Sequence, residues 1–174
     1  MVVDMGLLQS QHKDLTAPQA IFNYAAFLPE TESYEASSAS SGKATTDLTI
    51  KYPAATSYWK GDGSGNMLRT QDGQPHLDGV SEEQVSAKNV VVLEVQIDSS
   101  IRDARYGVIP KTVMVGSGKA WVFVDGKHIE GTWSKATQTS PIELLDSTGA
   151  VIKLTPGNTW VELKPDTVTM TITP

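Results

Sequence analysis

Two pairs of polar residues combine side chains suited to acid–base chemistry. His76 precedes Asp78, and His128 precedes Glu130, each pair separated by one residue. A histidine exchanges a proton near neutral pH, and a nearby carboxylate can orient its ring. One hypothesis is therefore a hydrolase that uses His76 and Asp78 with Lys135. No serine is identifiable as its nucleophile, so we keep this catalytic set as an alternative and assign no catalytic residue.

Metal and cofactor chemistry find little support in the spacing of these residues. The chain has no cysteine, which excludes a thiol nucleophile, a zinc–thiolate site and a disulfide framework. The two His–carboxylate pairs supply enough ligands for zinc or manganese, but no spacing forces the pairs together. The glycines of 116–119 lack the phosphate-loop spacing. We therefore expect neither a metal nor a cofactor.

The most informative pattern is a hairpin predicted over 116–135. Asp125-Gly126 favours a two-residue turn, because both central residues need positive φ. This turn sets Trp121 opposite Glu130 and predicts a core face of apolar residues. That core face carries Ala120, Val122, Val124, Ile129 and Trp133. The other face carries Trp121, Phe123, His128 and Glu130.

The mixed face of this hairpin has two interpretations. Its aromatic rings could stack on a sugar or peptide while the polar groups orient the ligand. Alternatively, a second layer, such as a helix over 17–28, covers the aromatic rings and leaves His128 and Glu130 at the edge. A second candidate binding surface is the polar loop over 67–78, with Arg69 and His76.

The elements that must position these residues are mostly strands. Apolar residues alternate with polar ones in several segments after residue 43, and turn residues separate these segments. We predict a mainly β domain over 44–174, an antiparallel sheet, barrel-like or sandwich, of about eight to ten strands. The length of 174 residues suits one domain of this kind.

The first 43 residues have a different pattern. Thr16 and Gln19 have capping-box spacing, and apolar residues follow at helical intervals up to Leu28, so we predict one short N-terminal helix over 17–28. The serine-rich segment 30–43 is typical of a flexible linker. The first residues lack the basic and apolar regions of a signal peptide, so an exported form would be a fragment or processed chain.

Composition excludes two classes of partner. The net charge of −6 argues against nucleic acid, whose binding requires a clustered basic surface. No apolar run approaches the roughly 20 residues of a membrane span. We therefore expect membrane attachment only through an anchor that this chain lacks.

Four segments, taken in order, resemble one bacterial family. They are Met67–Asp78, Ser86–Val92, Gly116–Lys135 and Pro156–Pro165. Together they are similar to the C-terminal domain of the YerB-like lipoprotein family, a domain of unknown function, over roughly 44–165. The matching positions are Arg69, His76, Asp78, Asn89, Gly118, Trp133 and Lys135.

The resemblance implies an extracytoplasmic location in the cell envelope, although the lipid-bearing cysteine of that family is missing here. We expect a non-catalytic module that binds an envelope component or a partner protein domain. Its candidate ligand-binding residues are Trp121, Phe123, His128, Glu130, Arg69 and His76. The alternatives are a cell-wall-directed hydrolase that uses His76, Asp78 and Lys135, and a structural domain that packs against a missing N-terminal domain.

Overall fold

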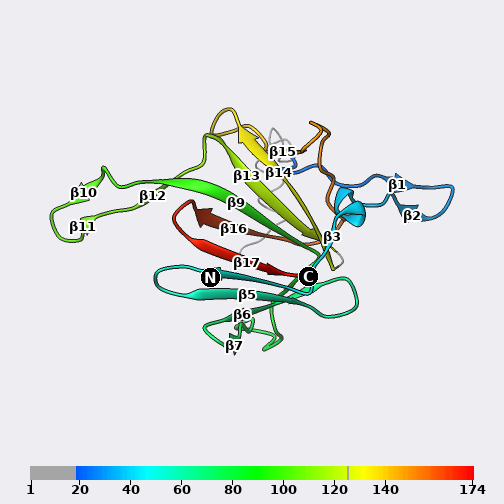
Figure 1. Cartoon of the computed structure of the whole chain (residues 1–174), viewed down its shortest axis with the longest axis horizontal. Helices are drawn as coiled ribbons and strands as arrows, with labels where there is room; N and C mark the ends of the chain where they lie inside the picture. Colours follow the sequence, from blue (N-terminus) through cyan, green and yellow to red (C-terminus); the bar gives the residue numbers. More distant parts are fainter. Residues whose placement is uncertain (1–18, 125) are drawn as a thin grey trace, which may run out of the picture.

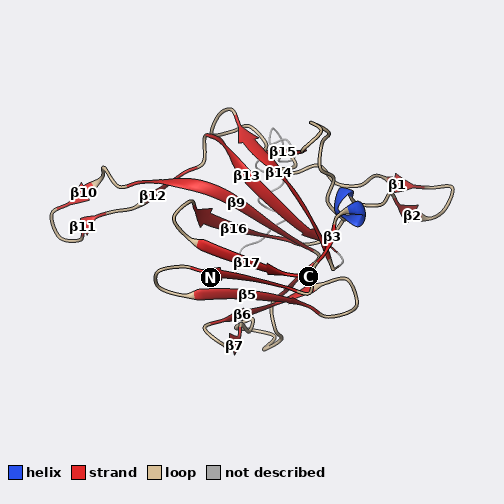
Figure 2. Ribbon diagram, viewed as in Figure 1, coloured by secondary structure: helices blue, strands red, loops and turns tan. Residues whose placement is uncertain are grey.

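The computed structural model of the protein describes residues 19–124 and 126–174, which form seventeen strands and one short 3-10 helix. Two sheets account for most strands (Figure 2). The seven-stranded sheet contains β12 (Lys111–Val113), β9 (Asn89–Asp98), β13 (Gly116–Val124), β14 (Lys127–Lys135), β15 (Glu143–Asp146), β16 (Thr159–Pro165) and β3 (Lys43–Ala44). The six-stranded sheet contains β17 (Thr169–Thr173), β4 (Asp47–Lys51), β5 (Thr56–Gly61), β6 (Met67–Gln71), β7 (Gln74–Pro75) and β8 (Ser86–Ala87). The mainly β prediction is confirmed, in the form of a two-sheet sandwich and not a closed barrel.

Among the seventeen strands, all pairs are antiparallel except one. β16 runs parallel to β9 from Thr159 opposite Asn89 to Pro165 opposite Val95, a pairing that the sequence did not predict. Two small hairpins project from opposite sides of the body (Figure 1). They are β1 (Phe27–Leu28) with β2 (Ser33–Tyr34), and β10 (Arg102–Asp103) with β11 (Gly107–Val108).

β9 is the central strand because both of its faces are buried. Val91 and Leu93 belong to one apolar cluster on the outer side of the seven-stranded sheet. Val90 and Val92 belong to a second cluster, between the two sheets. A strand buried on both faces has a continuous run of apolar residues, and this one reads Val-Val-Val-Leu from Val90 onward.

The predicted hairpin register is confirmed. β13 and β14 pair with Trp121 opposite Glu130, Phe123 opposite His128 and Val124 opposite Lys127. The expected core face lies against the outer cluster, where Val122 and Trp133 are buried. The two-residue turn chemistry therefore determined the pairing of all nine residue pairs along these strands.

The predicted helix over 17–28 is wrong over its described part. From residue 19 to Leu28 the chain contains no helical residue: it bends at residues 21 and 22, Tyr24 forms a parallel bridge with Leu154, and Phe27 begins β1. Backbone hydrogen bonds to the 152–154 segment stabilise this conformation, with Ala25 N donating to Leu154 O at 2.8 Å. A short isolated helix is marginal in water, so pairing with a neighbouring segment overrides the helical pattern. Residues 17 and 18 lie outside the described residues.

The serine-rich segment is not a free linker. The 3-10 helix η1 (Ser38–Ser41) places Ala39, which is fully buried, into the outer cluster. Ser38 N donates to Lys153 O at 3.0 Å, and Lys153 N donates to the Ser38 hydroxyl at 2.8 Å. Gly42 lies so close to His128 that a Cβ there would overlap the His128 carbonyl. The segment therefore packs firmly on the hairpin, because its small side chains allow close backbone contact.

The described residues include no helix of the length and apolar character needed to cross a membrane.

Candidate functional site

The inner face of the seven-stranded sheet presents three rows of side chains to the space between the sheets. Strand register sets the rows across β16, β9, β13 and β14. The first row is Trp160, Val90, Phe123 and His128; the second is Glu162, Val92, Trp121 and Glu130. Continuing this register, the third row is Lys164, Glu94, Lys119 and Thr132. These rows contain four of the six candidate ligand-binding residues named from the sequence: Trp121, Phe123, His128 and Glu130.

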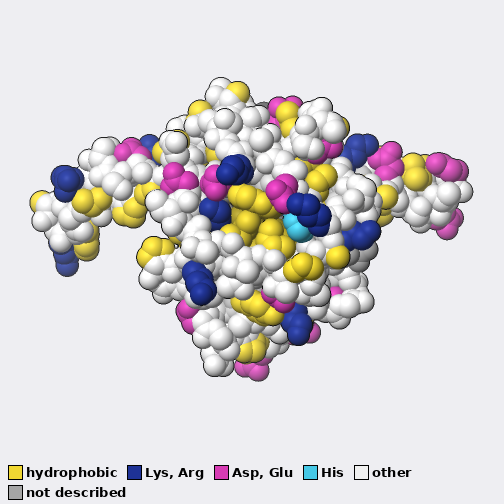
Figure 3. Space-filling model, in the orientation of Figure 1, with side chains coloured by type: hydrophobic (Ala, Val, Ile, Leu, Met, Phe, Trp, Pro, Cys, Tyr) yellow, Lys and Arg dark blue, Asp and Glu magenta, His cyan; other side chains and the backbone are white. Residues whose placement is uncertain are grey.

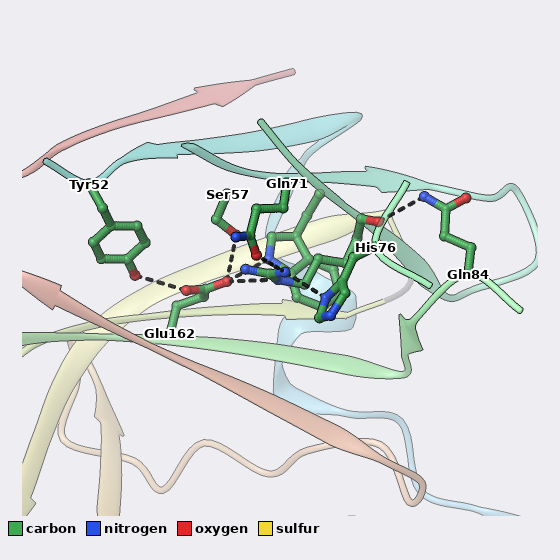
Figure 4. A network of polar contacts seen from close by, with 8 residues as sticks. Tyr52, Ser57, Gln71, His76, Gln84 and Glu162 are labelled. Carbon is green, nitrogen blue, oxygen red and sulfur yellow. Dashed lines mark hydrogen bonds and ion pairs between the residues drawn. The ribbon is translucent and has the colours of Figure 1, made fainter. Parts of the chain in front are cut away.

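A buried carboxylate links the two sheets (Figure 4). Glu162 accepts hydrogen bonds from the Ser57 hydroxyl at 2.6 Å, the Trp59 indole at 3.0 Å and the Tyr52 hydroxyl at 2.8 Å. Ser57 and Trp59 lie on β5, whereas Glu162 lies on β16 of the opposite sheet. Burial and the adjacent Glu162 charge raise the pKa of Tyr52, so Tyr52 remains a hydrogen-bond donor. We call this set with Arg69 and His76 the inter-sheet network.

Arg69 supplies the opposing charge in this network. Its Nε lies 3.6 Å from Glu162 Oε1, and both side chains are nearly buried. One guanidinium nitrogen donates to Gln71 Oε1 at 2.9 Å and lies 2.6 Å from His76 Nδ1. The guanidinium also stacks over the Trp160 ring at 4.9 Å. Arg69 Nε is a buried polar atom without a hydrogen-bond partner among the described residues. The nearby Glu162 charge is therefore what compensates the burial of this atom.

His128 forms a second polar cluster, near the crossover, which is the segment 45–46 that connects β3 of the seven-stranded sheet to β4 of the six-stranded sheet. Thr45 Oγ1 lies 2.5 Å from His128 Nδ1, and the ring stacks on Phe123. Burial lowers the pKa of His128. Nearby, Lys43 donates to Glu130 at 2.7 Å, and this hydrogen bond lowers the pKa of Glu130. A shallow hollow of about 410 Å³ lies against Lys43, His128 and Glu130.

The structure fits neither interpretation of the mixed face of the hairpin completely. Phe123 is fully buried and His128 is 5% exposed, because the second sheet and the crossover cover them. The covering layer is a sheet and not the predicted helix. Trp121 remains partly exposed, and Glu130 is exposed. The mixed face is thus half covered and half open.

The three residues of the hydrolase hypothesis do not meet. His76 contacts Arg69 and Trp160 between the sheets. Asp78 caps its own loop by accepting from the backbone N–H groups of residues 80 and 81, which lowers its pKa. The row that holds Trp160 meets β14 at His128, and Lys135 lies seven residues further along that strand. This separation is about 23 Å at roughly 3.3 Å per residue, and Lys135 is on the opposite face of the sheet. This geometry contradicts a shared role for His76, Asp78 and Lys135.

Several positions that carry the family resemblance have structural contacts. The Asn89 side chain exchanges two hydrogen bonds with the backbone of Thr155, at 2.8 and 2.9 Å. The Trp133 indole crosses its cross-strand neighbour Gly118 and donates to Glu94 O at 2.8 Å. A Cβ on Gly118 would overlap the Glu94 carbonyl and lie 2.7 Å from Trp133 Nε1. Backbone hydrogen bonds therefore explain the asparagine at position 89, and close packing explains Gly118 and Trp133.

Sequence reasoning missed the carboxylate at the centre of the network. Glu162 alternates with Trp160 and Lys164 along β16, which places a carboxylate and an aromatic ring on one strand face. That alternation is the available signal, but no local pattern shows that this face meets Ser57 and Trp59. Within the described residues, no group of three or more His, Asp or Glu side chains is arranged to hold a metal ion.

The open part of the mixed face forms a distinct surface. We define the uncovered corner as Lys119, Trp121, Glu130 and Thr132, on β13 and β14. Figure 3 shows a hydrophobic patch in the middle of the visible face, above β17 as it lies in Figure 1, with basic and acidic groups and a histidine around it. Trp121 is one of the partly buried side chains packed on the inter-sheet cluster, with Met170 and Ile172 of β17. An aromatic ring among charged groups can bind a ligand through stacking and ion pairing.

Comparisons with known proteins agree with this fold. Residues 48–161 match the family model described as "Protein of unknown function (DUF3048) C-terminal domain". The crystal structure of the YerB protein from Bacillus subtilis is similar to this chain, with a TM-score of 0.62 and 15% sequence identity; the match covers 97% of this chain and 68% of that one. The comparison with curated proteins found no match.

Proposed function

The chain belongs to the DUF3048 C-terminal domain family, and on that premise we propose that it is a non-catalytic binding or scaffolding module of the bacterial cell envelope. The observation that carries the proposal is the uncovered corner. Trp121 is the one aromatic residue of the mixed hairpin face that keeps solvent access, and charged side chains flank it. The extracytoplasmic location rests on the lipoprotein character of the family that the sequence resembles.

The burial of Arg69, Glu162 and His128 supports binding over catalysis. Arg69 and Glu162 use their charges on one another between the sheets. His128 is buried with a lowered pKa, and Thr45 lies against its Nδ1. A catalytic acid–base group must reach the proton that it transfers. The exposed groups of the corner, Lys119 and Glu130, are placed instead to contact a ligand surface.

A co-sedimentation experiment tests this function. The purified chain is mixed with bacterial envelope fractions, and Trp121→Ala is compared with Tyr106→Ala, an exposed aromatic on the distant β10–β11 hairpin. We expect the wild type and Tyr106→Ala to sediment equally, and Trp121→Ala to lose at least about tenfold in affinity, since an aromatic anchor contributes about 2 kcal/mol or more. Absence of sedimentation, or equal sedimentation of both variants, would contradict the proposal.

A second candidate function is packing against another protein domain. The β1–β2 hairpin projects from the body and exposes 52% of Phe27 and 54% of Tyr34, which meet edge to face at 5.3 Å. Ile21, which precedes this hairpin in the sequence, is also 59% exposed. Sedimentation that survives Trp121→Ala and is lost in Phe27→Ser/Tyr34→Ser would assign binding to this hairpin.

A further inference from the structure

We propose that β17 accepts an extended segment of a partner polypeptide as an additional strand, and that this segment covers the uncovered corner. The inference rests on the proposed binding function and names the chemistry of the partner. The segment places an apolar side chain over Trp121 and, two residues along, a carboxylate opposite Lys119. Strand addition to a free sheet edge is a recurrent mode of peptide recognition.

β17 has the properties of an edge open to pairing. Among the described residues it pairs only with β4, from Thr169 opposite Lys51 to Thr173 opposite Asp47. Its sequence, Thr-Met-Thr-Ile-Thr, contains no charge and no proline. Natural edge strands usually carry lysine, proline or a bulge that prevents further pairing. β17 lacks the first two of these protections and therefore offers its free backbone groups to another strand.

The position of β17 places this edge beside the uncovered corner. Just before the strand begins, Val168 O accepts a hydrogen bond from Lys164, in the third row on β16. At its end, Thr173 O accepts from Thr46 N at 2.9 Å, and the neighbouring Thr45 contacts His128, in the first row on β14. β17 therefore crosses diagonally beneath the inner face of the other sheet, and the corner lies beyond its free edge. A further strand, about 4.8 Å away, would lie under Trp121.

The charges at the corner determine what the segment should carry. Glu130 is neutralised by Lys43 at 2.7 Å, and Glu94 by Lys164 at 2.9 Å. Lys119 is exposed and has no ion pair with any residue in 19–124 or 126–174. The corner thus has a local positive charge in a chain of net charge −6. Lys119 and Trp121 alternate on β13, so an apolar residue and a carboxylate at the same spacing match both.

A second copy of the chain fits this edge poorly. Antiparallel pairing of β17 with its own copy has a two-fold axis perpendicular to the sheet. Both seven-stranded sheets would then lie on the same side of the joined sheet. In each copy, the uncovered corner on β13 and β14 extends beyond the free edge of β17. The seven-stranded sheets of the two copies would therefore overlap. A single strand avoids this clash.

The test uses a synthetic peptide, acetyl-Thr-Asp-Thr-Leu-Thr-Asp-Thr-amide, whose symmetry lets either strand direction place a carboxylate near Lys119. Its control has both Asp replaced by Lys. We expect the Asp peptide to bind at least about tenfold more tightly, and Lys119→Glu to reverse this preference, since like charges oppose binding. Lys60→Glu, an exposed lysine on β5, should leave the preference unchanged. Equal binding of the two peptides, or no reversal in Lys119→Glu, overturns the proposal.

Hydrogen exchange of the β17 backbone identifies the occupant. We expect alternate amides of Thr169–Thr173 to exchange freely in the monomeric chain and to be protected by the Asp peptide. Protection in the free monomer would mean that the chain covers its own edge, and protection with a dimeric mass would identify a second copy. Either result overturns the proposal.

Digestion of the envelope fraction separates failure of this inference from failure of the proposed function. Binding that depends on Trp121 and disappears after protease treatment supports a polypeptide partner. If it survives protease but is lost after muramidase treatment, the ligand is a glycan; the inference then fails and the proposed function stands. If no fraction binds through Trp121, the proposed function itself fails.

Discussion

The ion pair between the sheets gives a quantitative test of how the sandwich is held together. Glu162→Gln removes the charge at this position and keeps its shape. A Gln carbonyl can still accept from Ser57 and Trp59, and its amide can donate to the Tyr52 hydroxyl. The Arg69 guanidinium, 3.6 Å away and nearly buried, then has no opposing charge. The substitution therefore isolates the electrostatic contribution of the carboxylate.

Two estimates of the cost of Glu162→Gln agree. Coulomb's law at 3.6 Å with an effective dielectric constant of about 20 gives about 4–5 kcal/mol. Breaking a buried pair by removing one partner typically costs about 3–5 kcal/mol. We therefore expect the free energy of unfolding to fall by about 3–5 kcal/mol. Replacing both partners, in Glu162→Gln/Arg69→Met, should recover at least about 2 kcal/mol relative to the single variant, because no unpaired charge remains.

Urea unfolding followed by tryptophan fluorescence and circular dichroism measures both effects. Glu83→Gln is the matched control, since Glu83 is exposed and makes no ion pair among the described residues. It should change the free energy of unfolding by less than about 0.5 kcal/mol. A loss below about 1 kcal/mol in Glu162→Gln would refute the reasoning. So would a double variant less stable than the single one.

Two further predictions concern His128 and Gly118. Burial holds the pKa of His128 in the folded chain below its ordinary value. Between the folded and the unfolded pKa, the unfolded chain therefore binds more protons than the folded one. The free energy of unfolding should be highest above about pH 6.5 and should fall as the pH drops below it. Thermal unfolding between pH 5 and 7.5 should show this slope, and His128→Gln should flatten it; an unchanged slope in that variant contradicts the assignment. Gly118→Ala should lower the free energy of unfolding by about 1–3 kcal/mol, because the added Cβ displaces the Trp133 indole from Glu94 O. Urea unfolding checks this, and a variant as stable as the wild type would show that the indole is not constrained there.

The sequence predicted those parts of the fold that local chemistry determines. The Asp125-Gly126 turn set the register that brings Trp121 opposite Glu130. The helix over 17–28 was mispredicted because hydrogen bonds with Leu154, far along the chain, stabilise an extended segment instead. Periodicity describes a segment in isolation, and a short helix contributes too little stability to resist such pairing.

The candidate site was only partly predictable, for a related reason. Strand alternation placed Trp121, Phe123 and Glu130 on one face, but it could not show where the second sheet ends above that face. The cover stops between Phe123, which is fully buried, and Trp121, which is not. The role of Glu162 also depends on contacts with residues more than 100 positions away in the chain, such as Ser57 at a separation of 105. Separations of this size leave no local signature.

The parallel pairing of β16 with β9 has a consequence for how the chain folds. β9 cannot complete its sheet until a strand about 70 residues later in the sequence reaches it, as the Lys164–Glu94 contact shows. Long sequence separations raise the contact order and slow folding, because loop-closure entropy must be overcome before the contact forms. A nascent chain that ends before β16 leaves the Val90–Leu93 run without its final partner and Arg69 without its counter-charge. Such a chain exposes an apolar strand and an uncompensated charge, and we expect the sandwich to close only after β16 has been synthesised.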